Sequence, residues 1–532
     1  MVSSAEHEPE EHRPKGIPRR FWVMFLASLG ILISYADRSN MAVAIVAIAK
    51  EYDYTKQQQG FILSAFFFGY IMTQILGGAM ADRYGAKPVL AIGAFTWTLF
   101  TLLTPLASQK GYLWMVFIRI GLGLGEGVAF PSAHALVGVW APPCERSKAV
   151  AMLTTFSYLG AVIALPVSSS LVVSSWGWRS IFWLFGSLGL FWSIIWHVFG
   201  ASDPESCRGI TEQEVRYIRH QQQLDGQVEG YGNHVLDQVQ VFGSAELDSD
   251  SETEDPNPSP ELQATYHALT TERQSDEIRH QVEPIRKLSE EEDTPPNIDH
   301  ASRWTSFRNR VRSKAVTNMR MSSSAPVPWK LLLKRREVWA IILSQFCAAF
   351  GFFVMQSWTP TFYLEYFGVD VGKIGYFSVV PSIAQGIVGL SSGFLGDKAV
   401  RSWNWSFLSV RRVSQVIGGL GIATALVLAV TVARSAYGAM ALITVGMALN
   451  GFTMIGASAY QHDICPQYAG FIFSLGNTAG TIPGIVGVML AGLLVDKNGH
   501  TLWGLIWSMV AVFYCIGCTS FVLLSTNKKI HT

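Results

Sequence analysis

Long apolar stretches separated by polar segments make up most of this 532-residue chain. A helix needs about 20 mostly apolar residues to cross a bilayer. Six such stretches precede a polar segment at residues 201–330 and six follow it. The twelve are residues 21–49, 59–81, 88–107, 112–139, 149–173, 180–199, 337–363, 374–396, 412–433, 436–460, 469–494 and 502–524. The pattern predicts an all-α membrane protein with 12 transmembrane helices in two six-helix bundles.

The polar segments divide the chain into five predicted regions. The central one lacks apolar periodicity and is rich in Glu, Asp, Ser, Gln and Pro, a composition typical of disorder. Its one local signal, Thr211-Glu212-Gln213-Glu214, predicts a capping box that starts a short helix. The regions are an N-terminal tail at 1–20, a first bundle at 21–200, a central loop at 201–330, a second bundle at 331–525 and a C-terminal tail at 526–532.

Charge is unevenly distributed between these regions. The formal net charge of +1 combines a central loop of net −9 (23 acidic, 14 basic) with a remainder of net +10 (16 acidic, 26 basic). That remainder carries only 42 charges in 402 residues, which is too few to cover a water-soluble surface. The composition therefore excludes an ordinary soluble enzyme, a nucleic-acid binder and a secreted disulfide scaffold.

The distribution of Lys and Arg indicates the orientation, because cytosolic segments carry an excess of them. Short segments on the side of the N-terminus carry 14 Lys and Arg residues, and those on the opposite side carry seven. Both termini and the central loop are therefore predicted to be cytosolic. We expect a multi-pass protein of the plasma membrane or of an endomembrane such as the vacuolar one.

A short pattern recurs at the same place in the two halves. Gly78-x-x-x-Asp82-Arg83, with Gly85 beyond it, follows the second span, and Gly393-x-x-x-Asp397-Lys398 follows the eighth. Parallel six-span repeats are a transporter architecture. Glycine lets helices approach closely, the carboxylate can accept bonds from a neighbouring helix N-terminus, and the basic residue anchors the turn. We interpret the pattern as a gating motif, and a tight basic turn without a gating role is the alternative.

Four charged residues lie well inside the predicted spans, where burial is costly and a function is the default explanation. They are Asp37 and Arg38 in the first span, after Tyr35, and Arg119 and Glu126 in the fourth. Arginine offers a permanent charge and a planar fork to an oxyanion, and a buried carboxylate can exchange a proton as its surroundings change. The set predicts anion binding by Arg38 and proton coupling by Asp37 and Glu126, with Arg119 beside Glu126.

Structural roles compete with these interpretations. Arg119 and Glu126 are two helical turns apart on one face, so they can equally form a structural ion pair. His134 can titrate near neutrality or simply pack. The glycines from Gly121 to Gly127 predict close helix packing. No Gly-x-x-x-x-Gly-Lys-Ser/Thr sequence occurs, so we expect transport driven by ion gradients rather than by ATP.

Several segments taken jointly carry a family resemblance. They are residues 36–45, 68–70, 73–78, 125–131, 140–148, 202–205, 466–470 and 476–478. On these segments, which cover both six-helix halves, the chain resembles the anion:cation symporter branch of the major facilitator superfamily. That branch includes sialin-like carriers, sodium–phosphate cotransporters and plant phosphate carriers.

The resemblance implies alternating access around a central anion site. It implies that Arg38 contacts the substrate, that Tyr35, Tyr70 and Asn477 line the cavity, and that Asp37 and Glu126 couple protons. It also implies a monomer in membrane lipid that binds a small anion and no nucleic acid, is not an enzyme, and needs no cofactor besides a coupling H⁺ or Na⁺. The seventh span lacks the arginine of vesicular glutamate carriers, so glutamate is disfavoured.

The predicted function is secondary active transport of a small organic anion or inorganic phosphate, coupled to H⁺ or Na⁺. One alternative is a potential-driven uniporter for nucleotides or other anions. Another is a non-transporting receptor or scaffold that signals through the central loop. The four buried charges argue against the last alternative, because a protein that carries nothing has no use for them.

Overall fold

The computed structural model describes residues 18–207, 209–222, 329–464, 469–495 and 500–527. Within them, the twelve predicted spans are present as helices long and apolar enough to cross a membrane. The predicted tails and residues 223–328 of the predicted central loop lie outside the described residues, apart from a few residues at their edges. The side chains of Asp82 and Asp397 lie outside them as well.

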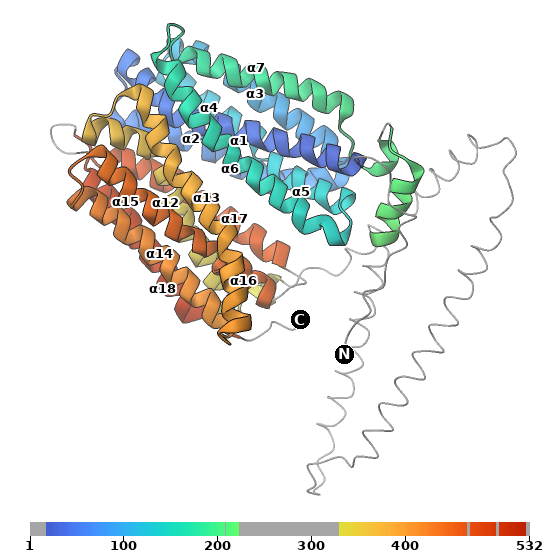
Figure 1. The fold of residues 1–532 in the computed structure, drawn as a ribbon. Coiled ribbons are helices and arrows are strands. Elements are labelled where there is room, and N and C mark those ends of the chain that lie inside the picture. Colours follow the sequence, from blue (N-terminus) through green and yellow to red (C-terminus); the bar gives the residue numbers. More distant parts are fainter. Residues whose placement is uncertain (1–17, 208, 223–328, 465–468, 496–499, 528–532) are drawn as a thin grey trace, which may run out of the picture. The chain divides into compact units, whose positions relative to one another are not determined.

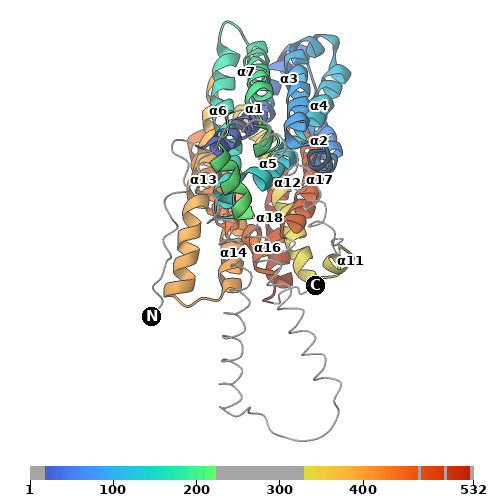
Figure 2. The same ribbon diagram turned by 90° about the vertical axis from the view of Figure 1, so that its right-hand side faces the viewer.

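Two groups of helices correspond to the two predicted bundles (Figures 1 and 2). The first half comprises α1 (Arg19–Tyr52), α2 (Lys56–Tyr84), α3 (Ala86–Lys110), α4 (Tyr112–Glu126), α5 (Ala129–Trp140), α6 (Pro143–Val173) and α7 (Arg179–Phe199). The second half, preceded by the short α11 (Trp329–Leu333), comprises α12 (Arg336–Phe367), α13 (Val371–Ser402), α14 (Phe407–Thr431), α15 (Ala436–Asn450), α16 (Ala457–Ile464), α17 (Ala469–Leu493) and α18 (Trp503–Leu524).

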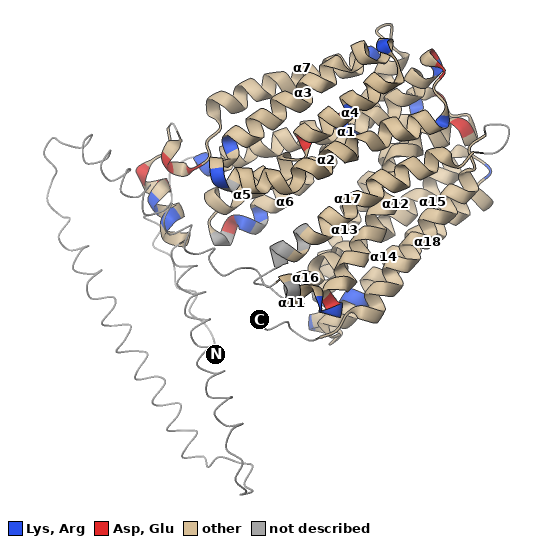
Figure 3. Ribbon diagram, turned by 180° about the vertical axis from the view of Figure 1, so that it is seen from behind, with Lys and Arg blue, Asp and Glu red and all other residues tan. Residues whose placement is uncertain are grey.

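The two ends of the helices carry most of the described charges, and few lie between them (Figure 3). We call the end at which α1 and α12 begin the near end, and the end at which they finish the far end. Large apolar side chains such as Leu113 and Phe394, which are 76% and 80% exposed, cover the outside of the helices. Such a surface is stable in lipid and not in water.

The fourth span of each half is broken, although the apolar pattern predicts one continuous helix in each. α4 ends at Glu126, and α5 begins at Ala129. In the second half α15 ends at Asn450 and is followed by a 3₁₀ turn, η3 (Gly451–Met454), before α16. A helix break frees backbone groups and re-aims side chains, which is why transporter sites are often built at such places.

Close helix packing explains the dense glycines of the fourth span. A Cβ atom on Gly123 of α4 would collide with the carbonyl oxygen of Phe66 in α2, and one on Gly125 would collide with the backbone of Trp97 in α3. Glycine is therefore required for the backbones to approach, as predicted from the sequence.

An arginine at the start of α1 joins three segments at the near end. Arg20 donates two hydrogen bonds to Glu145 of α6, of 2.8 and 3.1 Å. Glu214 accepts the backbone N–H groups of Arg19 and Arg20, each at 3.0 Å, and so caps α1. The predicted capping box is thus only partly correct. The backbone N–H of Glu214 does bond to Thr211 Oγ1 at 3.3 Å, but the Glu214 carboxylate binds α1.

The ninth span begins earlier than predicted. Arg411 lies inside α14 rather than in the loop before it, and its guanidinium bonds to both carboxylate oxygens of Asp463 in α16, at 2.7 and 3.2 Å. Asp397 and Lys398, the second copy of the predicted gating motif, likewise lie within α13, whereas Arg83 of the first copy lies in the last turn of α2.

The two halves contact each other at the far end and midway along the helices. At the far end Lys56 of α2 forms an ion pair with Glu365 of α12, and Ser169 Oγ of α6 accepts the backbone N–H of Gly375 in α13 at 2.8 Å. Midway, Thr481 of α17 bonds to Gln74 of α2 at 3.3 Å. These contacts join the two halves at the far end and midway along the helices.

Candidate functional site

Three aromatic rings surround Arg38 in the middle of the first half. The guanidinium carbon lies 4.6 Å from the ring centres of Tyr35 and Phe66 and 4.7 Å from that of Tyr70. Tyr35 precedes Arg38 on α1 by about one turn, and the other two rings come from neighbouring turns of α2. Cation–π contacts of this kind hold a guanidinium in place while leaving its N–H edge for an anion.

Glu126 faces this arginine from the break in the fourth span. Its Oε2 atom lies 3.4 Å from a terminal nitrogen of Arg38, and both side chains are buried. Arg119, two turns earlier on α4, places its guanidinium 5.3 Å from the Phe66 ring centre. Arg119 is also within electrostatic reach of Glu126, Asp37 and Arg38. The two predicted arginines therefore share the Phe66 ring, and Glu126 pairs with one of them, Arg38.

Asp37 is the fourth member, and it points to another side of α1. It is 1% exposed, and Asn40 donates to its Oδ1 at 3.5 Å. It interacts electrostatically with Glu126 and Arg119. The predicted proton-coupling residues Asp37, Glu126 and Arg119 thus form one buried cluster with the predicted substrate residue Arg38.

Several polar atoms of this cluster have no hydrogen-bond partner among the described residues. They are Arg38 Nε, Arg119 Nε, Glu126 Oε1 and Asp37 Oδ2. An unpaired buried polar atom costs about 1–3 kcal/mol. These two donors and two acceptors can therefore bond a further group that enters the cluster.

A cavity of only about 10 Å³ lies against the two arginines. That is room for about one water molecule, so no organic anion fits here in this state. Its walls come from both halves, and the second half contributes Gln356 and Ser357 of α12. Gln356 Nε2 also donates to Ser39 Oγ of α1 at 3.2 Å. The seam is therefore shut directly over Arg38.

Sequence reasoning missed Gln356 and Ser357. Neither carries a charge, and their position in an apolar span gives no signal that distinguishes them from other polar residues of the second half. Asn477, which it did select, lies on α17 and is exposed. Its carbonyl accepts the hydroxyl of Thr481 at 3.1 Å, and no described contact links it to Arg38.

A row of rings leads from Arg38 toward the near end. Tyr35 contacts Phe130 of α5, with ring centres 5.7 Å apart, and Phe130 contacts His134 one turn further on, at 5.8 Å. His134 is itself exposed. The packing role considered for it from the sequence therefore has a described partner, and its titration remains a prediction.

The first copy of the predicted gating motif runs through the last turns of α2 and ends in the turn before α3. Gly85 has a φ angle of +90°, a conformation that L-residues with side chains rarely adopt. Ser202 holds the turn by accepting the backbone N–H of Lys87 at 3.1 Å. Gly78 faces Pro131 of α5, and Arg83 is exposed beside Tyr84. A gating role for Gly78, Asp82, Arg83, Gly85, Asp397 and Lys398 remains a prediction.

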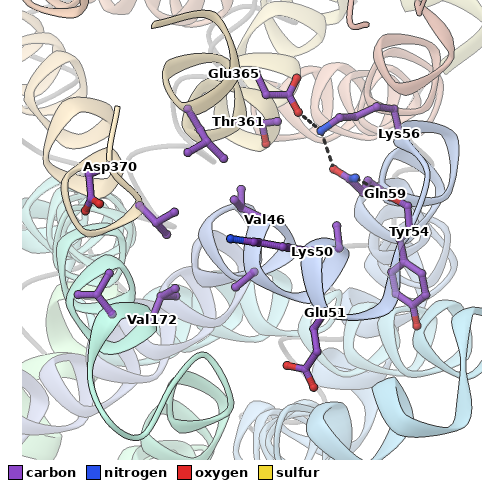
Figure 4. Close-up of a pocket in the computed structure, with 15 residues that line it drawn as sticks. Val46, Lys50, Glu51, Tyr54, Lys56, Gln59, Val172, Thr361, Glu365 and Asp370 are labelled. Atoms are coloured by element: carbon purple, nitrogen blue, oxygen red, sulfur yellow. Dashed lines mark hydrogen bonds and ion pairs between the residues drawn. The ribbon is translucent and has the colours of Figure 1, made fainter. Parts of the chain in front are cut away.

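A larger cavity of about 790 Å³ lies at the far end, between α1, α2, α6, α12 and α13. Figure 4 shows its charged lining residues, which include Lys50, Glu51, Lys56, Glu365 and Asp370. We call this cavity the far vestibule.

Comparison with known proteins gives consistent matches over nearly the whole chain. A family model described as Major Facilitator Superfamily matches residues 27–488. Probable anion transporter 4, chloroplastic, of Oryza sativa subsp. japonica is 29% identical over 513 residues, which are 96% of this chain and 70% of that protein. Sialin of Ovis aries is 28% identical over 548 residues, covering 97% of this chain and 91% of its own.

A solved structure shares the fold. It is described as a bacterial homologue of the human lysosomal transporter Spinster, in an inward-facing and occupied conformation. It is 14% identical to this chain, covers 96% of it with 97% of its own length, and superposes with a TM-score of 0.62. The likeness confirms the predicted fold of 12 helices in two six-helix bundles.

Proposed function

Because the chain belongs to the major facilitator superfamily, we propose that it is a secondary active transporter that carries a small organic anion or inorganic phosphate together with a proton. Membership confirms that the chain is a multi-pass membrane transporter and not an enzyme, and its relatives confirm the resemblance to the anion:cation symporter branch.

The charge balance around Arg38 is the observation that carries the proposal. Two arginines and two carboxylates, all buried, add up to zero when all four are ionised. An anion that enters this cluster leaves one uncompensated negative charge in a medium of low dielectric, which is costly. A proton taken up by Asp37 or Glu126 restores neutrality. Anion binding and proton binding therefore favour each other, which is the basis of symport.

Each residue has a definite part in this scheme. The anion binds the N–H edge of Arg38, which Tyr35, Phe66 and Tyr70 hold in place. Glu126 accepts from Arg38 in this state, at 3.4 Å, so an arriving anion competes with it for the guanidinium. Protonation of Glu126 weakens its hold on Arg38 and releases the arginine to the anion. Asp37 and Arg119 balance the remaining charge, and Asn477 reaches the anion only in another conformation.

Alternating access follows from the seam between the halves. In this state the two halves are joined at the level of the Arg38 site by the bond from Gln356 to Ser39, and at the far end by the contacts around the far vestibule. The turn at Gly85 and the motif residues beside it govern the near end. The excess of Lys and Arg at the near end supports a cytosolic orientation for it, with the substrate entering or leaving the cytosol there.

The test is uptake into liposomes that contain the purified protein. Radiolabelled phosphate, sialate, glucuronate, glutamate and nucleotides are supplied one at a time under an imposed pH gradient, Na⁺ gradient or membrane potential. We expect one anion class to accumulate with the pH gradient, and Arg38→Ala to abolish it. Accumulation only with a Na⁺ gradient would identify Na⁺ instead of H⁺ as the coupling ion. Accumulation only with a membrane potential would favour the uniporter. No uptake of any anion contradicts transport and favours a scaffold.

A further inference from the structure

The far vestibule and the small cavity at Arg38 lie on the same seam between α1 and α12. On α1, Arg38 and Ala42 line the small cavity, while Val46 and Lys50 line the vestibule. These four residues are spaced by four, so they follow one face of the helix.

The facing helix shows the same spacing. On α12, Ser357 lines the small cavity, and Thr361 and Glu365 line the vestibule. The two cavities are therefore consecutive chambers of one path, separated by about one helical turn. The bond between Gln356 and Ser39 joins the two helices at the level of the small cavity.

Each of the other charged residues of the vestibule has a hydrogen-bond or ion-pair partner among the described residues, whereas Lys50 has none. Glu51 binds Arg179 and accepts the indole N–H of Trp178 at 2.7 Å. The carboxylate of Asp370 accepts the backbone N–H of Gly372 at 2.8 Å.

The remaining two charges neutralise each other. Lys56 pairs with Glu365 and donates to Gln59 at 3.3 Å (Figure 4). Lys50 is exposed, and its ammonium has no partner among the described residues. It is thus the one cation of the described lining without a carboxylate partner, and it lies on the face of α1 that also carries Arg38. Asp370 of α13 keeps its negative charge, because its described partner is a backbone N–H.

We propose that Lys50 forms a second anion site in the far vestibule, which receives the transported anion before it reaches Arg38 or after it leaves. The ligand is a carboxylate or phosphate of the class that Arg38 binds, so the inference rests on the proposed anion transport. Twelve residues separate the two cations, about 18 Å along the helix axis. That distance exceeds the Debye length of about 8 Å at physiological salt, so Lys50 acts on an anion in the vestibule and not on one at Arg38.

A structural role is the competing explanation. Lys50 lies in the last turn of α1, where a cation stabilises the helix dipole. The two explanations predict different kinetics. If Lys50 only stabilises the helix dipole, its substitution lowers stability and leaves the substrate affinity unchanged on both sides of the membrane. An anion site in the far vestibule changes the apparent affinity only for substrate supplied from the far side.

The experiment replaces the charge and then restores it chemically. Lys50→Cys is reconstituted at a low protein-to-lipid ratio, and vesicles with the near end outward are captured through a tag at the C-terminus. The uncaptured vesicles then present the far end. The KM for labelled phosphate, sialate or glucuronate, whichever the wild type carries, is measured in both sets of vesicles. It is measured before and after the introduced cysteine is modified by one of two membrane-impermeant methanethiosulfonate reagents. One reagent adds a quaternary ammonium and the other a sulfonate.

We expect Lys50→Cys to raise the far-side KM about fivefold, the effect of one unit charge near an anion in water-like surroundings. The ammonium reagent should restore the wild-type KM, and the sulfonate reagent should raise it further. The near-side KM should not change. Lys110→Cys is the matched control, because Lys110 is an exposed cation at the far end outside the vestibule. Wild type treated with each reagent controls for the native cysteines.

Two results would overturn the proposal. One is an unchanged far-side KM in Lys50→Cys. The other is an equal effect of the two reagents, which would assign Lys50 to packing or to the helix dipole. Both leave transport at Arg38 intact. Absence of any anion uptake by the wild type is a different result, because it removes the proposed function together with this inference.

Discussion

The two halves share a fold and differ in what they bury. Among the described residues, the first half encloses Asp37, Arg38, Arg119 and Glu126 within its spans. Among the second-half side chains that the structure describes, the only buried charged one is Glu337, in the first turn of α12 at the near end. Its interior polar contacts are neutral, as in the bonds from Gln385 to Asn450 at 2.9 Å and from Gln415 to Ser344 at 3.0 Å.

The broken fourth spans make this comparison specific. The helix before the break ends at Glu126 in the first half and at Asn450 in the second. Glu126 pairs with an arginine and leaves one oxygen without a described partner. Asn450 accepts from Gln385 and donates to the carbonyl of Gly418. The same architectural position thus carries a group that can exchange a proton in one half and a satisfied amide in the other.

We infer from this difference a division between the halves, in which the first half binds and couples and the second half closes over the site. Binding and coupling need charges that change partners, and these lie in the first half. Closure needs a rigid surface that moves as a unit, and neutral hydrogen bonds supply rigidity without the desolvation cost of ions. The second half meets the site through Gln356 and Ser357.

Loss of the anion ligand should have the largest effect. Arg38→Ala removes the fork and leaves Glu126 buried without its partner, so we expect transport to fall at least about a hundredfold, or about 3 kcal/mol. Initial uptake rates at matched protein amounts measure this. Arg38→Lys keeps the charge without the fork and should recover only part of the rate. Normal uptake by well-folded Arg38→Ala, judged by gel filtration, would place the site elsewhere.

Loss of the coupling carboxylate should separate accumulation driven by a pH gradient from the exchange of anions. Glu126→Gln keeps the shape of the side chain but cannot release a proton, so accumulation driven by a pH gradient should fall about tenfold. Exchange of labelled for unlabelled anion across the same liposomes should persist, because it needs no net proton movement. Unchanged pH-driven accumulation would assign coupling to Asp37, for which Asp37→Asn is the parallel variant.

The equivalent position in the second half should affect stability and not coupling. Asn450→Ala removes two hydrogen bonds and leaves Gln385 unpaired, which costs about 1–2 kcal/mol and should lower the Tm in detergent by several degrees. The ratio of pH-driven to exchange uptake should equal that of the wild type. A changed ratio would show that coupling extends into the second half and would end the division proposed above.

The smallest effect is expected at the seam. Gln356→Ala removes one neutral hydrogen bond to Ser39, which contributes about 1 kcal/mol, so the KM should change no more than about fivefold with coupling intact. Gln356→Glu is the informative partner, because a negative charge beside the Arg38 cavity should repel the anion and raise the KM further. Equal KM values for the two variants would exclude Gln356 from the path of the substrate.

Much of the site could be predicted because charged residues are rare in apolar spans. Asp37, Arg38, Arg119 and Glu126 were identifiable as a set by the cost of burying them, and local spacing placed each on its helix. The aromatic neighbours were accessible only in part. The resemblance indicated Tyr35 and Tyr70, whereas Phe66, which contacts both arginines, is one apolar residue among many in α2.

By itself, the sequence determined the twelve spans, their grouping in two halves and the few charges that must be buried, because hydrophobicity and charge are properties of local segments. Only the tertiary structure decided that Arg38 meets Glu126 across 88 residues of chain and that the fourth span of the first half breaks beside the site. It likewise decided that Gln356 closes over Arg38 while Lys50 stays unpaired in the far vestibule. Such contacts depend on how helices distant in sequence pack against one another, and hydropathy carries no record of that packing.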